Sequence, residues 1–366
     1  MKKGMDLLHI ILSVSTGLLV TYLCIYLLEP VAIHVGLVDV PGGRKQHSHP
    51  VPLIGGMAIF IGFIFSLMCL NISLGPYRGL FAGGAMLILL GVLDDFHELT
   101  PRIRLVGQCV ASLLLIRWGN ASLDHLGNLF FLGPVNLGVW SIAATVFFVI
   151  AFINAINMID GCDGLAGLTI FTQALFLIYL CIRFHLEASA FLLALFCATL
   201  AMFLLFNMPL PWRKRARIFM GDAGSMFMGF LIAWFSVDVS QVLLMHQHSQ
   251  MHFNLVTVLW ILAYPLFDLL SVVLHRILKR RSPFKESRDH LHFILRDCGM
   301  RKASVTFLLV FLSIFFGMLG MMLAHTQYVE ADQLLVFVGV FVIYFSVTVI
   351  LQKRINAKSL NLSLSS

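Results

Sequence analysis

The sequence predicts an all-α polytopic membrane protein of about 10–11 transmembrane helices, and three observations support this fold class. Of its 366 residues, 59% are hydrophobic and only 12% are charged, whereas about 25% are charged in a typical soluble domain. The mean hydropathy is +0.92. The apolar residues form continuous runs of roughly 20 residues, the length of a helix that crosses a bilayer, and not the alternating segments of a membrane β-barrel. A soluble enzyme and a disordered chain are therefore excluded.

Eleven apolar runs are the predicted spans. The first follows a basic start but is longer than the apolar core of a signal peptide, so we expect it to be retained. The runs at 79–93 and 105–118 are short, which leaves a count of ten open. The runs are 7–28, 51–73, 79–93, 105–118, 137–153, 165–182, 188–206, 223–240, 254–275, 304–324 and 333–351, in a single integral membrane domain over residues 1–366.

The distribution of Lys and Arg predicts the orientation of these spans. Five joints carry 20 of the 25 basic residues, and this bias marks cytoplasmic loops. We therefore expect a cytoplasmic C-terminus and, with eleven spans, a periplasmic N-terminus. The net charge of +7 favours membrane lipid and phosphate-bearing substrates, and no nucleic-acid-binding module is recognisable. The basic joints are 29–50, 94–104, 207–221, 276–303 and the tail from 352.

Six aspartates lie in or beside the predicted spans, five of them at cytoplasmic helix ends. Aspartate at the centre of a membrane helix costs about 2.5–3.5 kcal/mol, so such residues usually face a polar cavity. Each could alternatively cap a helix or anchor it at the interface, but together they predict one polar site. The six are Asp94, Asp95, Asp160, Asp163, Asp222 and Asp268. The loops expected to form this active site are 29–50, 94–104, 154–164, 207–222 and 276–303.

The segment GVLDDFHELTPRIR places Asp94 and Asp95 at the end of an apolar helix, followed by Arg102 and Arg104. Adjacent carboxylates can hold a divalent cation, and arginines supply hydrogen-bond donors to phosphate oxygens. The alternative is that the carboxylates only pair with the two arginines.

In the segment NAINMIDGCDG, Asn154, Asn157 and Asp160 recur every three residues. They step around one broad face if the helix continues through them, and Gly161 and Gly164 then allow a sharp turn. Amide and carboxylate oxygens suit Mg²⁺, and amides also suit the edge of a base. The full calcium-loop pattern is absent.

In the segment RKRARIFMGDAGS, basic residues precede Gly221 to Ser225, where a new helix is expected. Small residues at a helix N-terminus admit a phosphate to the backbone N–H groups, and Asp222 can hold a metal. The alternative is that Asp222 is only a helix cap. Gly55 and Gly56 are expected to serve helix packing, because no nucleotide-binding glycine motif is present.

The longest basic joint, 276–303, contains His290 and His292. We expect this pair to contact phosphate and to have no packing role. Two alternatives remain: a zinc site that includes Cys298, and a solvated loop that touches lipid headgroups.

Taken in order, these segments resemble the polyprenyl-phosphate N-acetylhexosamine-1-phosphate transferase family. The matching pieces span residues 36 to about 292 and are GLVDVPGGRKQHSHPVPLIGG, GVLDDF, NAINMIDGCDG, FMGDAGS, PLFD and the loop from SPF to RDHLH. The resemblance implies a multi-pass enzyme of the bacterial inner membrane, with its active site facing the cytoplasm. Its reaction would transfer GlcNAc 1-phosphate from UDP-GlcNAc to undecaprenyl phosphate and release UMP. The lipid-linked product would initiate O-antigen lipopolysaccharide or enterobacterial common antigen.

The resemblance also implies residue roles. Asp94 and Asp95 would act at the lipid phosphate. Because a phosphate ester ionises near neutral pH without help, we favour direct attack over a covalent aspartyl intermediate, and Asp94 over Asp95 as the base. Mg²⁺, which Mn²⁺ could replace, would be held by Asp222 and Asn157. Further catalytic residues would be Asp160, Asp163, His290 and His292, and substrate-binding residues Arg104, Asn154, Asn157, Asp268 and Arg288. Phe293 stands where relatives often carry another histidine.

Three alternatives stay open at this point. The donor could be another UDP-N-acetylhexosamine. The chain could be a cation- or proton-coupled secondary transporter, whose carboxylates would lie near the middle of the bilayer. It could also act as a monomer or as a homodimer.

Overall fold

The computed structural model describes residues 7–40, 50–70, 73–210, 213, 215–245, 253–282, 288–326 and 329–364. Parts of the predicted runs and joints lie outside these residues: 41–49 in the first basic joint, 71–72 in the second run, 211–212 and 214 in the third basic joint, and 283–287 in the fourth.

Each of the eleven predicted runs contains a helix, which confirms the all-α membrane fold. The helices are α1 Leu7–Val35, α2 Gly55–Leu67, α3 Arg78–His97, α4 Pro101–Gly119, α5 Ser141–Ile159, α6 Leu165–Arg183, α7 Glu187–Asn207, α8 Gly221–Met245, α9 Leu255–Ile261, α10 Ala263–Leu278, α11 Leu291–Asp297, α12 Lys302–Ala324 and α13 Glu330–Leu364. Two short antiparallel pairs join β1 Val38–Asp39 to β2 Val51–Pro52, and β3 His125–Gly127 to β4 Val135–Asn136. Neither α11 nor the strands were predicted from the sequence.

Within the described residues, eight helices are long and apolar enough to cross a membrane, and the count is nine if the bent pair of α9 and α10 is taken as one broken span. The short run at 79–93 is a full span in α3, which begins earlier and ends later than predicted. The run at 51–73 contains only the 13 residues of α2. The 19-residue α4 carries Arg102, Arg104 and Arg117, which lowers its hydropathy.

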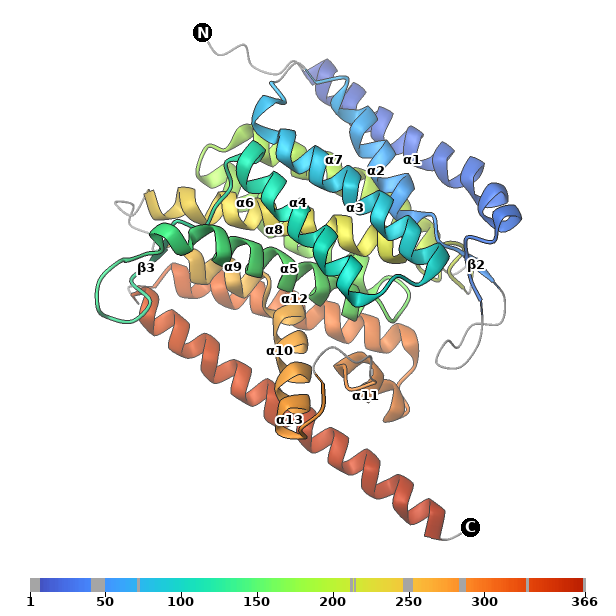
Figure 1. Ribbon diagram of the computed structural model, residues 1–366, viewed down its shortest axis with the longest axis vertical. Helices are drawn as coiled ribbons and strands as arrows, with labels where there is room; N and C mark the ends of the chain where they lie inside the picture. The colour runs from blue at the N-terminus through green and yellow to red at the C-terminus, as the bar shows by residue number, and fades with distance from the viewer. Residues whose placement is uncertain are drawn as a thin grey trace.

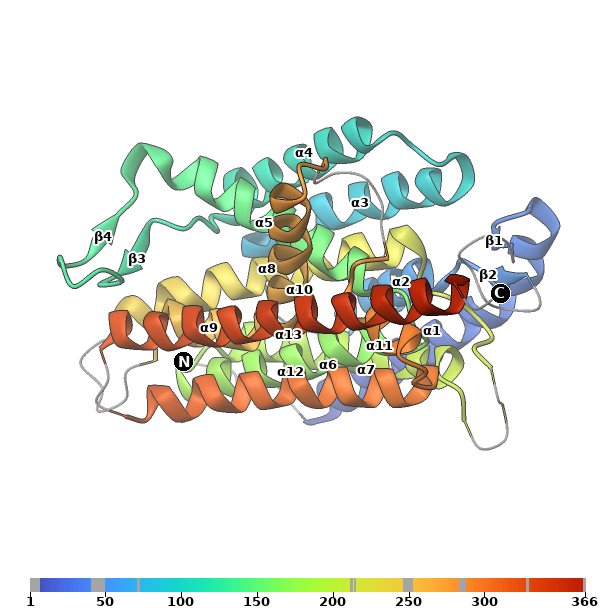
Figure 2. The same ribbon diagram turned by 90° about the horizontal axis from the view of Figure 1, so that it is seen from below.

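The predicted single span at 254–275 is two helices, which meet at 80°. Pro265 explains the break, because it has no N–H to donate to the carbonyl one turn earlier and its ring clashes with that turn. Proline is tolerated in the first turn of the new helix, where N–H groups have no partner within the helix. As a result α10 lies across the direction of the other helices (Figures 1 and 2).

The remaining long helices run side by side, with the chain ends at opposite ends of the bundle (Figures 1 and 2). The central helix is α8, of which 18 of 25 residues are buried. Its N-terminus lies at the end that carries β2 and α11, where the loops with the predicted site residues also meet (Figure 1).

The N-terminus of α8 is held between α2 and α3 by close backbone contacts. A Cβ on Gly56 would collide with the backbone of Gly224, and a Cβ on Gly91 would collide with the backbone of Ala223. The N–H of Gly56 also donates to the carbonyl of Met220 over 3.0 Å. The packing role predicted for Gly56 is therefore confirmed, and the start of α8 is fixed in position.

Candidate functional site

Asp94 lies at the end of α3 and is only 4% exposed. One of its oxygens accepts the backbone N–H of Leu99 over 2.7 Å, and the other forms an ion pair with Arg104 at 3.2 Å. Glu98 turns the chain between these partners with a left-handed backbone. The predicted pairing of Asp94 with an arginine is thus present.

Asp95, one residue later, has a different set of partners. Its carboxylate accepts the backbone N–H of Asp222 over 2.9 Å and that of Ala223 over 3.4 Å. These are donors of the first turn of α8, which have no partner within the helix. Gly221 has φ +70°, and a Cβ there would lie 2.5 Å from an Asp95 oxygen. Asp95, and not Asp222 itself, therefore caps α8.

The side chain of Asp222 faces α5. Its Oδ1 accepts the side-chain amide of Asn157 over 2.5 Å, and the same amide nitrogen lies 2.9 Å from the Ser225 hydroxyl. The two residues predicted as metal ligands therefore lie in contact.

The end of α5 differs from the predicted continuous helix. The helix ends at Ile159 and Asp160 follows it with ψ 54°, so Asp160 does not share the face of Asn154 and Asn157. Asn154 donates its side-chain amide to Gln108 of α4 over 2.8 Å. Its role in substrate binding remains a prediction.

Asp160 is accessible, but the protein packed around it removes much of the water that would solvate its charge. This desolvation, with repulsion from Asp222, Asp163 and Asp39, raises the pKa of Asp160 to about 7. A cation bound beside Asp160 would therefore favour the ionised form of this carboxyl group near neutral pH.

The turn after Asp160 is fixed by its neighbours. Gly164 has φ +76°, as a sharp turn requires, and donates its N–H to the Asn207 side chain over 2.8 Å. The carbonyl of Asp163 accepts the Thr306 hydroxyl over 3.2 Å. Gly161 is needed for a different reason, since a Cβ there would collide with Nε2 of His292.

His290 and His292 occupy unlike environments at the start of α11. Nδ1 of His290 lies 2.6 Å from Oδ2 of Asp268. His292 is fully buried, neither of its ring nitrogens has a hydrogen-bond partner among the described residues, and burial lowers its pKa to about 3. The expectation that His292 has no packing role is wrong, because its neutral ring fills the space beside Gly161.

Arg288 precedes the histidines. Its guanidinium donates to Asp297 over 3.0 Å and lies 5.5 Å from the centre of the Phe293 ring. Phe293 therefore contributes a ring contact to Arg288 at the position where a third histidine was expected.

The donor atoms fit a magnesium ion better than zinc. Within the described part of the chain, no three His, Cys, Asp or Glu side chains form a metal-binding group, and Nδ1 of His290 is already paired. Zinc requires three or four such ligands, whereas Mg²⁺ is usually held by one or two carboxylates with water and substrate phosphates. Asp222 and Asn157 supply oxygens of the right kind.

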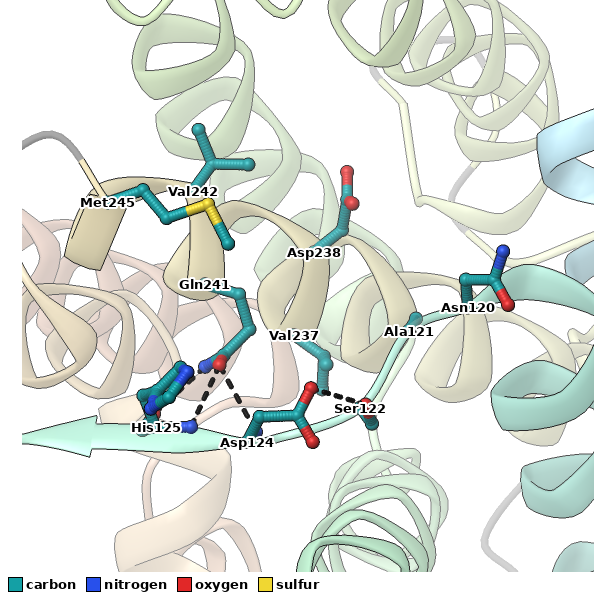
Figure 3. Close-up of a pocket in the computed structure, with 10 residues that line it drawn as sticks. All are labelled: Asn120, Ala121, Ser122, Asp124, His125, Val237, Asp238, Gln241, Val242 and Met245. Carbon is teal, nitrogen blue, oxygen red and sulfur yellow. Dashed lines mark hydrogen bonds between the residues drawn. The ribbon is translucent and has the colours of Figure 1, made fainter. Parts of the chain in front are cut away.

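A cavity of about 220 Å³ lies elsewhere, at the opposite end of α8. Asp238 is 16 residues after Asp222, which places it about 24 Å away along the helix. Figure 3 shows its carboxyl pointing away from Asp124, and Asp124 already binds the hydroxyls of Ser122 and Ser141. None of the six aspartates predicted to form the polar site lines this cavity.

Asp268, the carboxylate predicted to lie deepest, is joined to His290 at the same end of the bundle. The six aspartates therefore do not form a pathway across the bilayer, as a transporter would need.

Sequence reasoning missed Gln108, Ser225 and Tyr344, which are partners of predicted site residues. Tyr344 belongs to a polar series with a four-residue spacing in an apolar helix, and this spacing is a readable signal.

Comparison with known proteins gives consistent matches over nearly the whole chain. Residues 77–240 match the family described as glycosyl transferase family 4. Three relatives are each described as an undecaprenyl-phosphate alpha-N-acetylglucosaminyl 1-phosphate transferase. The protein of Haemophilus influenzae is 36% identical over 91% of this chain and 92% of its own length. The proteins of Escherichia coli O157:H7 and Yersinia pestis are 32% and 31% identical over 91% of this chain and 90% and 91% of theirs.

Proposed function

Because this chain belongs to glycosyl transferase family 4, we propose that it transfers GlcNAc 1-phosphate from UDP-GlcNAc to undecaprenyl phosphate. The observation that carries this proposal is the contact between Asp95, Asp222 and Asn157 at the end of a membrane bundle. It gathers three predicted site residues from three helices in one place, in a chain aligned over 91% of its length with such transferases.

The reaction is a phosphoryl transfer. An oxygen of undecaprenyl phosphate forms a bond to the sugar-proximal phosphorus of UDP-GlcNAc, and the bond from that phosphorus to the oxygen of UMP breaks. The products are undecaprenyl-pyrophosphoryl-GlcNAc and UMP. Such reactions depend mainly on positioning and on stabilising negative charge.

The position of each site residue suggests its role in this reaction. Asp94 is the base that accepts a proton from the lipid phosphate, and Arg104, its ion-pair partner, can donate to a phosphate oxygen. Asp95 holds the start of α8, so that Asp222 faces the site. Asp160 and Asp163 lie at the neighbouring turn, and His290 contacts a phosphate of the donor.

Asp222 and Asn157 would hold Mg²⁺, or Mn²⁺ in its place. When bound, the ion neutralises charge on the pyrophosphate that forms and breaks. Repulsion among the carboxylates of Asp222, Asp160 and Asp95 supports the binding of a cation there.

The lipid phosphate attacks directly, without a covalent intermediate on an aspartate. A phosphate ester ionises near pH 6 without help, so a covalent step would remove no obvious barrier. Lipid-free enzyme should therefore not exchange labelled UMP into UDP-GlcNAc. Such exchange would demonstrate a covalent sugar-phosphate enzyme and overturn direct attack.

The active site faces the cytoplasm in the bacterial inner membrane, where UDP-GlcNAc is available. The bias of basic residues towards the joints at this end supports this orientation. The product would serve surface polysaccharides of the O-antigen or enterobacterial common antigen type.

The proposal is tested with purified protein in lipid nanodiscs that contain undecaprenyl phosphate. The protein is given Mg²⁺ and, separately, radiolabelled UDP-GlcNAc, UDP-GalNAc and UDP-glucose, and the lipid extract is scored for labelled product. We expect product with UDP-GlcNAc and release of UMP in equal amount. Product with UDP-GalNAc alone would favour the alternative donor, and no lipid-linked product with any sugar would overturn the proposal.

A further inference from the structure

Asp268 in α10 is a buried carboxylate whose two oxygens both have protein partners. It is 1% exposed. Its Oδ2 lies 2.6 Å from Nδ1 of His290, and its Oδ1 accepts the backbone N–H of Leu291 over 2.9 Å and the hydroxyl of Tyr344 over 3.2 Å. All of these hydrogen-bond partners are protein groups, and the shortest of the contacts is the one to His290.

Tyr344 belongs to the last helix, α13, which presents a polar stripe to α10 and to the segment before α11. Its members, four residues apart, share one face of the helix. Tyr344 donates to Asp268, Thr348 lies 3.0 Å from the hydroxyl of Ser271, and Gln352 donates to the carbonyl of Asp289 over 3.3 Å. Polar side chains in a membrane helix usually face such protein partners, so α13 fastens both parts that carry the Asp268–His290 pair.

The contact with Asp268 fixes the orientation of the His290 ring. A carboxylate accepts hydrogen bonds, so Nδ1 of His290 must carry the proton that points at it. Nε2 is then the ring nitrogen available to a substrate. The ring lies nearly parallel to that of His292, with 5.8 Å between the centroids and 18° between the planes. His292 in turn packs on Gly161, next to Asp160, which brings the pair to the carboxylate cluster.

We propose that Asp268 and Tyr344 are positioning residues that hold the Nδ1–H of His290, so that the doubly protonated ring donates from Nε2 to a phosphate of the nucleotide-sugar donor. This inference rests on the proposed function for the identity of the donor. The Asp268–His290 geometry itself does not depend on it.

A carboxylate that orients a histidine has a large effect on turnover when that histidine takes part in the reaction. Replacing the carboxylate by an amide presents an N–H to Nδ1, so that Nδ1 can no longer carry a proton and the ring can no longer become the charged, doubly protonated form. In serine proteases the same substitution lowers turnover by about 10⁴-fold. Tyr344 makes one of the three hydrogen bonds to the carboxylate, and because the other two remain when it is lost, we expect about a fivefold decrease in kcat.

The first test compares turnover in three variants. Asp268→Asn should lower kcat more than about 100-fold with a smaller change in KM for UDP-GlcNAc, and Tyr344→Phe should lower kcat about fivefold. The matched control is Tyr264→Phe, since Tyr264 is also a buried tyrosine of this region and its hydroxyl has no hydrogen-bond partner among the described residues. Wild-type kcat in Tyr344→Phe, or an equal loss in Tyr264→Phe, would overturn the role of Tyr344.

The second test measures the protonation of His290 directly and does not depend on enzyme activity. Protein labelled with ¹⁵N-histidine is studied by NMR, and the His290 signal is identified by its loss in His290→Gln. We expect Nδ1 of His290 to be protonated in the wild type at every pH measured, and to lose that proton in Asp268→Asn. An unprotonated Nδ1 in the wild type would overturn the proposal. If the expected signal is present but the wild type makes no lipid-linked sugar, the proposed function fails and the Asp268–His290 arrangement stands.

Discussion

The carboxylate of Asp95 accepts the backbone N–H of Asp222 over 2.9 Å, which couples the end of α3 to the start of α8. The adjacent Asp94 instead binds Arg104 and the N–H of Leu99. The two neighbouring carboxylates therefore have different partners: Asp95 holds the backbone of a proposed metal ligand, and Asp94 holds Arg104, which is proposed to bind phosphate.

Replacement of Asp95 should separate its capping role from its charge. Asp95→Ala leaves the first N–H groups of α8 without an acceptor, and we expect a loss of about 1 kcal/mol in the free energy of unfolding. Asparagine is also a good capping residue, so Asp95→Asn should keep most of this stability. The Mg²⁺ concentration that gives the half-maximal rate should also rise more in Asp95→Ala than in Asp95→Asn. Equal effects of the two substitutions on both measurements would contradict a capping role.

Loss of the Asp222 carboxylate should abolish transfer, because one charged oxygen ligand of the proposed metal site disappears. The measurement is formation of lipid-linked product by Asp222→Asn across a range of Mg²⁺ and Mn²⁺ concentrations. The matched control is Asp238→Asn, the same change at the far end of α8, where we expect a rate near that of the wild type. Full turnover of chelator-treated wild-type protein would show that the metal assignment is wrong.

The helices of this protein were predictable because an apolar run long enough to cross a bilayer has few other stable conformations. The break between α9 and α10 was harder to predict. Pro265 is visible in the sequence, but the 80° angle depends on how α10 packs against α12 and α13. Local sequence carries no such information.

The residues of the candidate site were predictable from the sequence, but the partners of each residue were not. The pattern of aspartates at helix ends located Asp94, Asp95, Asp160 and Asp222 correctly at one end of the bundle. Consecutive residues of a helix point about 100° apart, so the two aspartates of α3 meet different neighbours, and only the fold shows which. Likewise the two histidines look equivalent in the sequence, although only His290 is paired with a carboxylate.

The contact between Gly161 and His292 should make this glycine sensitive to the smallest substitution. A Cβ at Gly161 collides with the His292 ring, and overpacking of a buried site typically costs about 1–3 kcal/mol. We expect Gly161→Ala to lower turnover at least tenfold, because it displaces the histidine segment. Gly339→Ala is the matched control, since a Cβ there meets nothing within 4 Å. If both variants turn over at the wild-type rate, His292 does not fix this segment.

The raised pKa of Asp160 predicts how stability should depend on pH in the absence of divalent cations. Desolvation by the surrounding protein and repulsion from the neighbouring carboxylates raise the pKa of Asp160 to about 7 in the folded protein, whereas an unfolded aspartate titrates near pH 4. The folded state therefore binds the additional proton between these values, and its stability falls as the pH rises from about 4 to about 7, with no further loss from this group above that range. Asp160→Asn cannot ionise, so the difference between its unfolding midpoint and that of the wild type should grow through this window and then level off. The measurement is thermal unfolding in chelator-containing detergent from pH 4 to 8.5. Asp222→Asn, which removes one repelling charge, should move the window to lower pH, and a difference between Asp160→Asn and the wild type that stays constant with pH would contradict the assignment.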